Sequence, residues 1–243
     1  MEKKIHYCWF GRGNKPKIFY KCLKSWKKNY PDYEIIEWNE DNFDINCNEY
    51  VKDAYRCKKY AFVSDYARLK IIYDCGGLYF DTDVESLKRI DDNILKSGFF
   101  AKETQNTINT GLGFGASKNN KIIKMLMDDY NNEHFLVNGE MNLKTCVQRV
   151  SELLVNKGYN ISNDNCIIDG IPVYNPEFFC GFDVKNDNYL ITSNTYNVHH
   201  YSGTWLSKKD KTIMFLKRTL SKIVGIKNYE KLRKLKNRKK DEK

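Results

Sequence analysis

The sequence has no run of about 18 apolar residues, the length that a membrane-spanning helix requires. Its basic start, MEKKIHYCWF, lacks the long apolar segment and the small-residue cleavage site of a secretory signal peptide. We therefore expect it to form the first strand of a mature, cytoplasmic protein. The length of 243 residues suits one α/β domain, or one domain followed by a tail.

The eight cysteines are scattered and include no C-x-x-C pair. A zinc site is therefore not expected. Since no signal peptide points to an oxidising compartment, free buried thiols are expected in place of disulfides.

Net positive charge is absent from most of the chain. The net charge is +10, but residues 206–243 alone carry +11, so residues 1–205 carry the difference of −1. We therefore expect two parts, a domain at 1–206 and a basic amphipathic helical tail at 207–243. Such a tail could bind an anionic membrane surface. A helix that is simply exposed to solvent is an equally open interpretation. Nucleic acid is not expected as a partner, because the basic residues are not interleaved with aromatic platforms.

The N-terminal part predicts a strand, a helix and a second strand. The apolar runs KIHYCWF at 4–10 and YEIIEW at 33–38 are typical of buried strands. Between them, a helix that begins at Pro16 is predicted by apolar residues four apart, namely Ile18, Cys22 and Trp26. This order predicts an α/β fold with a partly parallel sheet.

A long helix is predicted over residues 60–75, because Gly76 and Gly77 form a C-terminal glycine cap. Residues 78–81 are then expected to form a short strand that leaves the core. Further elements are expected as strands at 98–102, near Cys166, near Tyr189 and at 197–201, and as helices at 120–130 and 140–157.

Two aspartates end the segment GGLYFDTDVE. On a continued strand, Asp81 and Asp83 would point to the same face. Neighbouring carboxylates repel each other unless a cation lies between them, and their hard oxygens suit Mg²⁺ or Mn²⁺. The carboxyl ends of strands in α/β sheets are also where ligands bind. A solvated turn is the alternative, because an Asp-x-Asp pair alone is a weak signal.

On the preceding helix, Asp65 and Arg68 stand three residues apart on an otherwise apolar stripe. The two side chains form either a structural ion pair or a pair that faces a ligand. Taken alone, the structural pair is the more common arrangement.

The segment AFVSDYARLKIIYDCGGLYFDTDVE resembles the core of the DxD-containing glycosyltransferases of family 32, which include bacterial capsule and lipopolysaccharide transferases. It is also similar to the catalytic core of the large clostridial glucosylating toxins. The shared pattern is Ala-x-x-Ser-Asp-x-x-Arg, then Gly-Gly-x-Tyr-x-Asp-x-Asp. IHYCWFG, VYNPEFFCGF and HHYSGTW resemble three further segments of the family. The resemblance covers most of residues 1–206 and implies a GT-A fold, with a Rossmann-like mixed sheet flanked by helices.

The resemblance also implies where a nucleotide-sugar donor would bind. Tyr7 and Trp9 would lie at the nucleotide base, although a core position for Trp9 is equally open. Asp65 and Arg68 would contact the hydroxyls of the donor sugar, and Tyr79 matches the tyrosine before the carboxylates.

A metal site at the carboxylates is implied as well. Asp81 would bind a ribose hydroxyl and metal-bound water, and Asp83 would ligate Mn²⁺ or Mg²⁺. His200 is our preferred further ligand, and His199 is the reserve candidate. Only one of the two is expected to bind the metal, because adjacent residues of a strand point to opposite faces.

Three more residues match the donor site of the family. Asn109, in NTGLGFGA, would line the sugar site, with a turn asparagine as the alternative. Ser202 and Trp205 would close over the diphosphate, although Thr204 replaces the usual serine before this tryptophan. The acceptor motif of the family has no match at 138–140.

The resemblance implies a metal-dependent, retaining transfer of a hexose from a nucleotide sugar, with UDP-sugar favoured. The acceptor would be a glycan or a lipid-linked glycan in cell-surface polysaccharide synthesis. Two alternatives stay open. A haloacid-dehalogenase-like phosphatase also carries an apolar strand that ends in Asp-x-Asp, and a basic membrane- or RNA-binding module would depend on the tail alone.

Overall fold

The computed structural model describes residues 1–164, 166–183, 188–203 and 212. The chain divides into two compact units. Met1–Phe182 and Tyr189–Ser202 form the first unit, which holds every element discussed below except one residue each of β12 and β13, namely Asp183 and Asn188. The predicted tail and its boundary at 206 lie outside the described residues. None of the helices in the described ranges is long and apolar enough to cross a membrane.

The central sheet has the order β2-β1-β3-β7. β1 (Lys4–Cys8) pairs in parallel with β2 (Glu34–Trp38) and with β3 (Gly77–Tyr79), whereas β7 (Phe114–Ala116) is antiparallel to β3. α1 (Lys17–Asn29) connects β1 to β2, so the predicted βαβ unit is confirmed. The mixed α/β class is confirmed with it.

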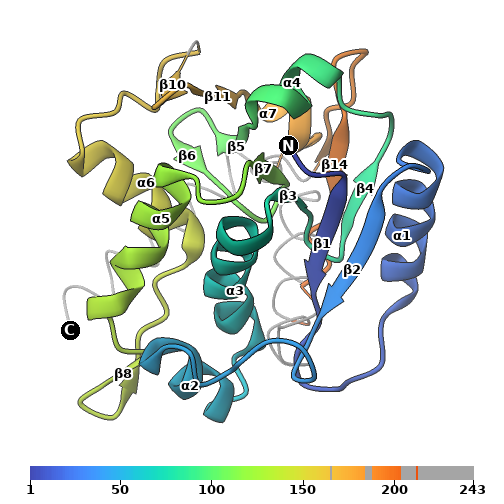
Figure 1. The fold of residues 1–243 in the computed structure, drawn as a ribbon. Coiled ribbons are helices and arrows are strands. Elements are labelled where there is room, and N and C mark those ends of the chain that lie inside the picture. Colours follow the sequence, from blue (N-terminus) through green and yellow to red (C-terminus); the bar gives the residue numbers. More distant parts are fainter. Residues whose placement is uncertain (165, 184–187, 204–211, 213–243) are drawn as a thin grey trace. The chain divides into compact units, whose positions relative to one another are not determined.

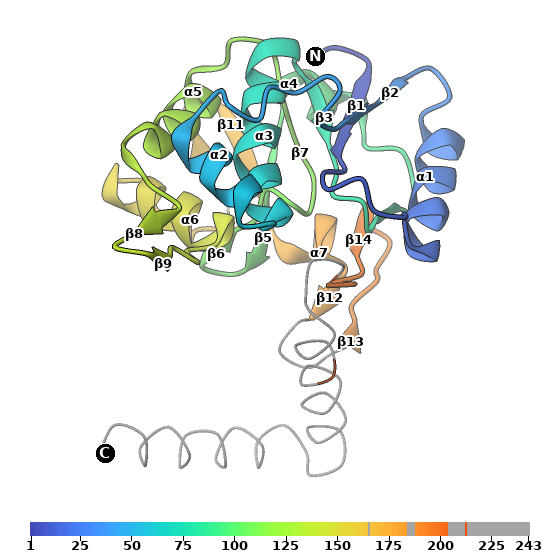
Figure 2. The same ribbon diagram turned by 90° about the horizontal axis from the view of Figure 1, so that it is seen from below.

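Helices cover both faces of this sheet, with α3 (Tyr60–Cys75) on one side and α1 on the other (Figures 1 and 2). The side chains of β1 alternate accordingly. Ile5 and Tyr7 pack in the core that contains Trp26 of α1, and Cys8 packs in the core that contains most of α3. α3 is apolar on most of its faces because it is buried between the sheet, α2 (Glu49–Arg56) and α5 (Lys121–Asp128).

A second four-stranded sheet has the order β10-β11-β5-β6, and an isolated bridge between Phe99 and Gly115 joins it to the central sheet. It contains β10 (Ile167–Ile168), β11 (Ile171–Tyr174), β5 (Phe100–Thr104) and β6 (Thr107–Ile108). The remaining elements are β4 (Val84–Ser86), which pairs with β14 (Asn197–His199), α4 (Asp92–Ser97), the 3-10 helix Asp129–Asn132, β8 (Leu136–Val137), which pairs with β9 (Glu140–Met141), α6 (Cys146–Asn156), α7 (Pro176–Phe179), β12 (Phe182–Asp183) and β13 (Asn188–Tyr189).

Most predicted elements occur within a few residues of their expected bounds, and α3 has the expected limits. Two predictions are wrong. The helix expected at 140–157 begins only at Cys146, because Thr145 and Gln148 form a capping box there and residues 140–141 belong to a hairpin. The strand expected at 78–81 ends at Tyr79.

Candidate active site

The Asp-x-Asp pair lies on a turn between β3 and β4. The backbone N–H of Val84 donates to the carbonyl of Asp81 at 3.0 Å, which closes a four-residue turn. Strand alternation therefore does not set the directions of Asp81 and Asp83, contrary to the sequence-based expectation. The turn follows the carboxyl end of β3, which is the edge of the sheet where ligands bind in α/β folds.

Asp81 is held by α3, by its own strand and by a loop. Arg68 Nη2 lies 3.1 Å from Asp81 Oδ1, and the hydroxyl of Tyr79 donates to the same oxygen at 3.0 Å. A Cβ atom on Gly111 would lie 2.3 Å from Asp81 Oδ2, so only glycine permits this loop to approach the carboxylate. Burial raises the pKa of Asp81, and Arg68 opposes that shift.

Asp65 and Arg68 form the second part of the site. Arg68 Nη2 lies 3.0 Å from Asp65 Oδ1, and the side chain of Arg68 is only 4% exposed. The backbone N–H and thiol of Cys146, the first residue of α6, favour the charged form of Asp65 and so lower its pKa. Burial raises the pKa of Asp65, whereas these donors and Arg68 stabilise its charged form. One guanidinium thus joins the carboxylates of α3 and of the turn.

Asp83 is held by His199, the last residue of β14, and by Ser202 in the segment that follows this strand. Its Oδ1 lies 3.1 Å from Nε2 of His199, and its Oδ2 accepts from both the backbone N–H and the hydroxyl of Ser202 at 2.8 Å. Burial alone would raise the pKa of Asp83, but His199 and Ser202 hold it below its usual range. Burial alone would lower the pKa of His199, and Asp83 raises it instead. The contact between Asp83 and His199 therefore favours the charged form of both groups.

The two adjacent histidines point in different directions. His200 directs Nε2 to Glu85 Oε2 at 2.8 Å and contacts the hydroxyl of Tyr189 with Nδ1 at 3.0 Å. The structure therefore brings His199, the reserve candidate, to the carboxylate turn and directs the preferred His200 to Glu85. The pairing of β14 with β4 decides this, because it fixes which face each residue of β14 occupies.

The two aromatic residues expected at the nucleotide base differ in their surroundings. Tyr7 is buried against Phe19 and Trp26, and its hydroxyl donates to Glu37 at 2.7 Å. Trp9 follows the end of β1, is half-buried, and donates its indole N–H to the carbonyl of Gly13 at 2.7 Å. Tyr7 is thus a core residue in this structure, whereas Trp9 lies at the carboxyl edge of the sheet. Trp205 lies outside the described residues.

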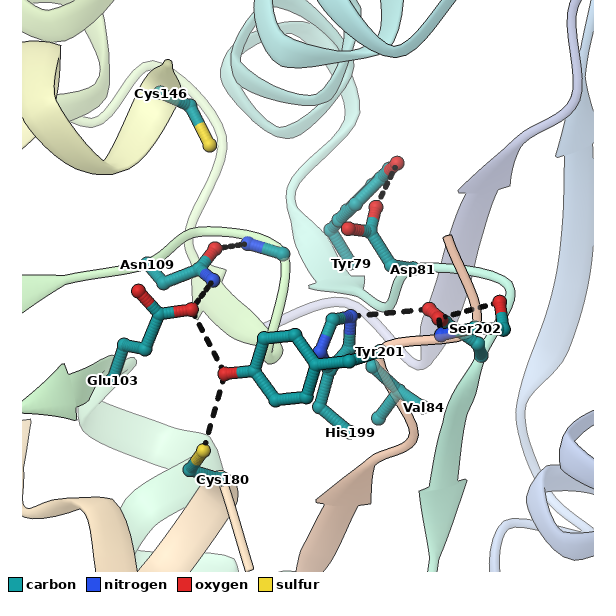
Figure 3. A network of polar contacts seen from close by, with 12 residues as sticks. Tyr79, Asp81, Val84, Glu103, Asn109, Cys146, Cys180, His199, Tyr201 and Ser202 are labelled. Atoms are coloured by element: carbon teal, nitrogen blue, oxygen red, sulfur yellow. Dashed lines mark hydrogen bonds and ion pairs between the residues drawn. The ribbon is translucent and has the colours of Figure 1, made fainter. Parts of the chain in front are cut away.

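Asn109 lies in the loop that approaches Asp81. Its Oδ1 accepts from the backbone N–H of Gly111 at 2.7 Å, and its Nδ2 donates to Glu103 at 3.0 Å. Glu103 also accepts from the hydroxyl of Tyr201 at 2.8 Å (Figure 3). Sequence reasoning did not identify Glu103, Tyr201 or Cys146. The only available signal was the place of Tyr201 within HHYSGTW.

The family resemblance implies a divalent cation, so we compared the donor atoms with that requirement. The described ranges contain no preformed group of three or more His, Cys, Asp or Glu side chains around one point. Mg²⁺ and Mn²⁺, however, commonly take one or two carboxylates and complete their shell with water and phosphate oxygens. Nδ1 of His199 is buried and has no hydrogen-bond partner among the described residues, and Nε2 is held by Asp83. Asp83 and His199 therefore fit such a cation, which would replace the imidazolium proton as the positive charge between them.

A family comparison matches this part of the chain. The model described as "glycosyltransferase sugar-binding region containing DXD motif" matches residues 16–100, which include Asp65, Arg68 and the Asp81–Asp83 turn. Residues 16–100 are thus similar to the sugar-binding region of DXD-containing glycosyltransferases. This similarity favours a sugar transferase over the phosphatase alternative.

Two known proteins are similar to parts of the chain. The chain is 27% identical over 160 residues to subversion of eukaryotic traffic protein A of Legionella pneumophila, in an alignment that covers 53% of this chain and 24% of that protein. The chain thus spans about a quarter of the length of this curated relative. Among solved structures, the PaToxG glycosyltransferase is similar at a TM-score of 0.49 with 18% identity, over 64% of this chain and 68% of that one.

Proposed function

We propose that this protein is a metal-dependent, retaining glycosyltransferase of the GT-A type that transfers a hexose from a nucleotide sugar, with UDP-sugar favoured. The convergence of the Asp81–Asp83 turn, the Asp65–Arg68 pair and His199 at the carboxyl edge of the central sheet carries the proposal. Open α/β sheets bind nucleotides at this edge. A diphosphate needs positive charge, whereas a sugar needs fixed polar partners, and the site offers both.

Each group has a role that follows from its surroundings. Arg68 and Asp65 are held rigidly by buried contacts and would orient the sugar hydroxyls. Asp81, with a side chain that is 26% exposed, would face the ribose and metal-bound water, while Asp83 and His199 would hold Mn²⁺ or Mg²⁺. The cation would stabilise the charge that develops on the departing diphosphate. Trp9, at the same edge, would stack on the base.

The transfer breaks the bond between the anomeric carbon and the diphosphate oxygen and forms a bond from that carbon to an acceptor hydroxyl oxygen. We favour attack from the face that the diphosphate leaves, with a diphosphate oxygen accepting the hydroxyl proton. The rigid frame around Asp65, Arg68 and Asp83 supports this route, because it can hold the donor fixed while the acceptor approaches.

We further propose a glycan or lipid-linked glycan as acceptor, in cell-surface polysaccharide synthesis. A cytoplasmic location, with the basic tail on an anionic inner membrane face, would bring the enzyme close to such acceptors.

Thermal shift and donor hydrolysis against a panel of UDP- and GDP-sugars, with and without Mn²⁺, test the proposal. We expect one donor to raise the melting temperature only with metal, in proportion to RT ln(1 + [L]/Kd), and to be hydrolysed slowly. Hydrolysis of an aryl phosphate by the wild type, with no response to any donor, would contradict it.

A further inference from the structure

Glu103, near the end of β5, receives hydrogen bonds from two segments that are far apart in the sequence. The same oxygen, Oε1, accepts from Asn109 Nδ2 at 3.0 Å and from the hydroxyl of Tyr201 at 2.8 Å. In Figure 3 the carboxylate lies between these two side chains. No role was predicted for Glu103 from the sequence, and the roles proposed above do not include it.

On one side, the contact with Asn109 extends to Asp81. Asn109 Oδ1 accepts from the N–H of Gly111, whose carbonyl accepts from the N–H of Asp81 at 3.3 Å. The missing side chain of Gly111 is what lets this loop lie against the Asp81 carboxylate. Glu103 therefore fixes the orientation of the Asn109 amide, and the amide in turn fixes the loop that borders Asp81.

On the other side, the contact with Tyr201 extends to Asp83. Tyr201 has a φ of +45°, a conformation that L residues seldom adopt without support from their surroundings. Its ring packs edge-on against His199 at 4.1 Å, and its hydroxyl also contacts the thiol of Cys180 at 3.3 Å. His199 and Ser202, which flank Tyr201 by one or two residues, hold the two oxygens of Asp83.

We infer that Glu103 is a positioning residue that joins the loop beside Asp81 to the segment that holds Asp83, and so fixes the spacing of the two DXD carboxylates. A carboxylate suits this place because one ionised oxygen accepts two hydrogen bonds strongly. The catalytic consequence of this inference rests on the proposed function, whereas its structural consequence does not.

The first experiment needs no nucleotide sugar. Amide hydrogen exchange of the full chain is compared among the wild type, Glu103→Ala, Glu103→Gln and Gln105→Ala. Gln105 is the matched control, because it follows the same strand and bonds to Ser162 and Asp164, away from the site. In Glu103→Ala we expect exchange at Gly111 and at Ser202 to accelerate together, by at least tenfold. Glu103→Gln keeps an acceptor oxygen and should remain close to the wild type, as should Gln105→Ala.

The second experiment uses the donor found by the panel described above. Glu103→Ala should lower kcat/KM for donor hydrolysis by about tenfold, the effect of losing hydrogen bonds to a charged group, and Glu103→Gln should restore most of it. In the double variant with Tyr201→Phe the two losses should not add, because both substitutions remove the same link. A purely structural role would lower the melting temperature without this rescue or this non-additivity.

The outcomes separate the two proposals. Exchange that accelerates in a chain that hydrolyses no donor would support the positioning role and overturn the proposed function. Unchanged exchange at both Gly111 and Ser202, together with wild-type kinetics in Glu103→Ala, would overturn the positioning role alone. If Glu103→Ala does not fold, Tyr201→Phe decides, and unchanged exchange at Ser202 in that variant overturns the inference.

Discussion

Two regions of this protein each bury an arginine and a histidine, and they do so differently. One region, here called the frame, is the interior of the domain around Arg149 and His6. Arg149 pairs there with Asp129 at 2.9 Å and Glu133 at 3.2 Å, and it stacks on the rings of Tyr50 and Tyr130. At the edge of the sheet, Arg68 pairs with Asp65 and Asp81. The carboxylates of the frame lie on consecutive segments of one helical region, whereas those at the edge come from a helix and from the DXD turn.

The two histidines show the same contrast. His6 is fully buried, and both ring nitrogens are bonded, one by the indole N–H of Trp38 and the other to the carbonyl of Gly76, each at 3.0 Å. His199 is paired with Asp83 through one nitrogen, while the other lacks a hydrogen-bond partner among the described residues. The frame thus pairs both ring nitrogens of His6 and the charge of Arg149 internally, although Nε of Arg149 lacks a hydrogen-bond partner among the described residues. At the edge, it is a histidine nitrogen, the kind of atom that can bind a metal, that lacks a partner.

The largest effect should come from Asp83→Asn. It keeps the shape of the side chain and removes the charge that holds His199 and would hold the cation, so donor turnover should fall by on the order of a thousandfold. Steady-state hydrolysis at saturating Mn²⁺ measures it. Turnover within tenfold of the wild type would remove Asp83 from the metal site. The corresponding Asp83→Ala should also lower the free energy of unfolding, because it leaves the buried imidazole unpaired.

The two arginines should respond in opposite ways. Arg149→Met should lower the free energy of unfolding by roughly 3–5 kcal/mol, because it leaves Asp129 and Glu133 without their buried partner, yet donor binding by the folded protein should persist. Arg68→Met should abolish measurable donor binding at protein concentrations where Arg149→Met still binds. Urea unfolding and calorimetric titration report the two quantities. The distinction between the two arginines would be contradicted if Arg149→Met lost donor binding while it remained fully folded.

The pH dependence of stability should identify His6 as a frame residue. Burial lowers the pKa of His6 to about 4, so between that pH and the ordinary value near 6.5 the unfolded chain binds more protons than the folded one. The free energy of unfolding therefore rises with pH through this window, and acidification from pH 7 to pH 5 should cost up to about 2 kcal/mol through His6. In His6→Gln this contribution should vanish. Parallel stability curves for the two proteins would show that His6 does not titrate as described.

The smallest contrast concerns the adjacent histidines. His199→Asn should lower donor turnover by about tenfold or more, because it removes the partner of Asp83. His200→Asn breaks contacts with Glu85 and Tyr189, outside the carboxylate turn, so its effect should stay within threefold. The half-saturating Mn²⁺ concentration is the second measurement, and it should rise only for His199→Asn. Equal responses would contradict the assignment of His199 over His200.

The sequence by itself determined most of the local elements and the similarity of one segment to a known family. Apolar spacing after Pro16, the two glycines after Cys75 and the βαβ order predicted α1, the end of α3 and the parallel core, because these features depend on residues close together in the chain. The pattern from Ala61 to Asp83 likewise indicated the DXD family, whose sugar-binding region is matched by residues 16–100.

Only the tertiary structure decided how the side chains meet. The turn after β3, in place of a longer strand, directs Asp81 to Arg68 and Asp83 to His199. The register of β14 on β4 brings His199, and not His200, to Asp83. Packing against Phe19 and Trp26 places Tyr7 in the core. The bridge from Glu103 to Asn109 and Tyr201 spans 98 positions on its longer side. Contacts of this kind leave no periodic signal in the sequence, because they arise from the way separate segments pack.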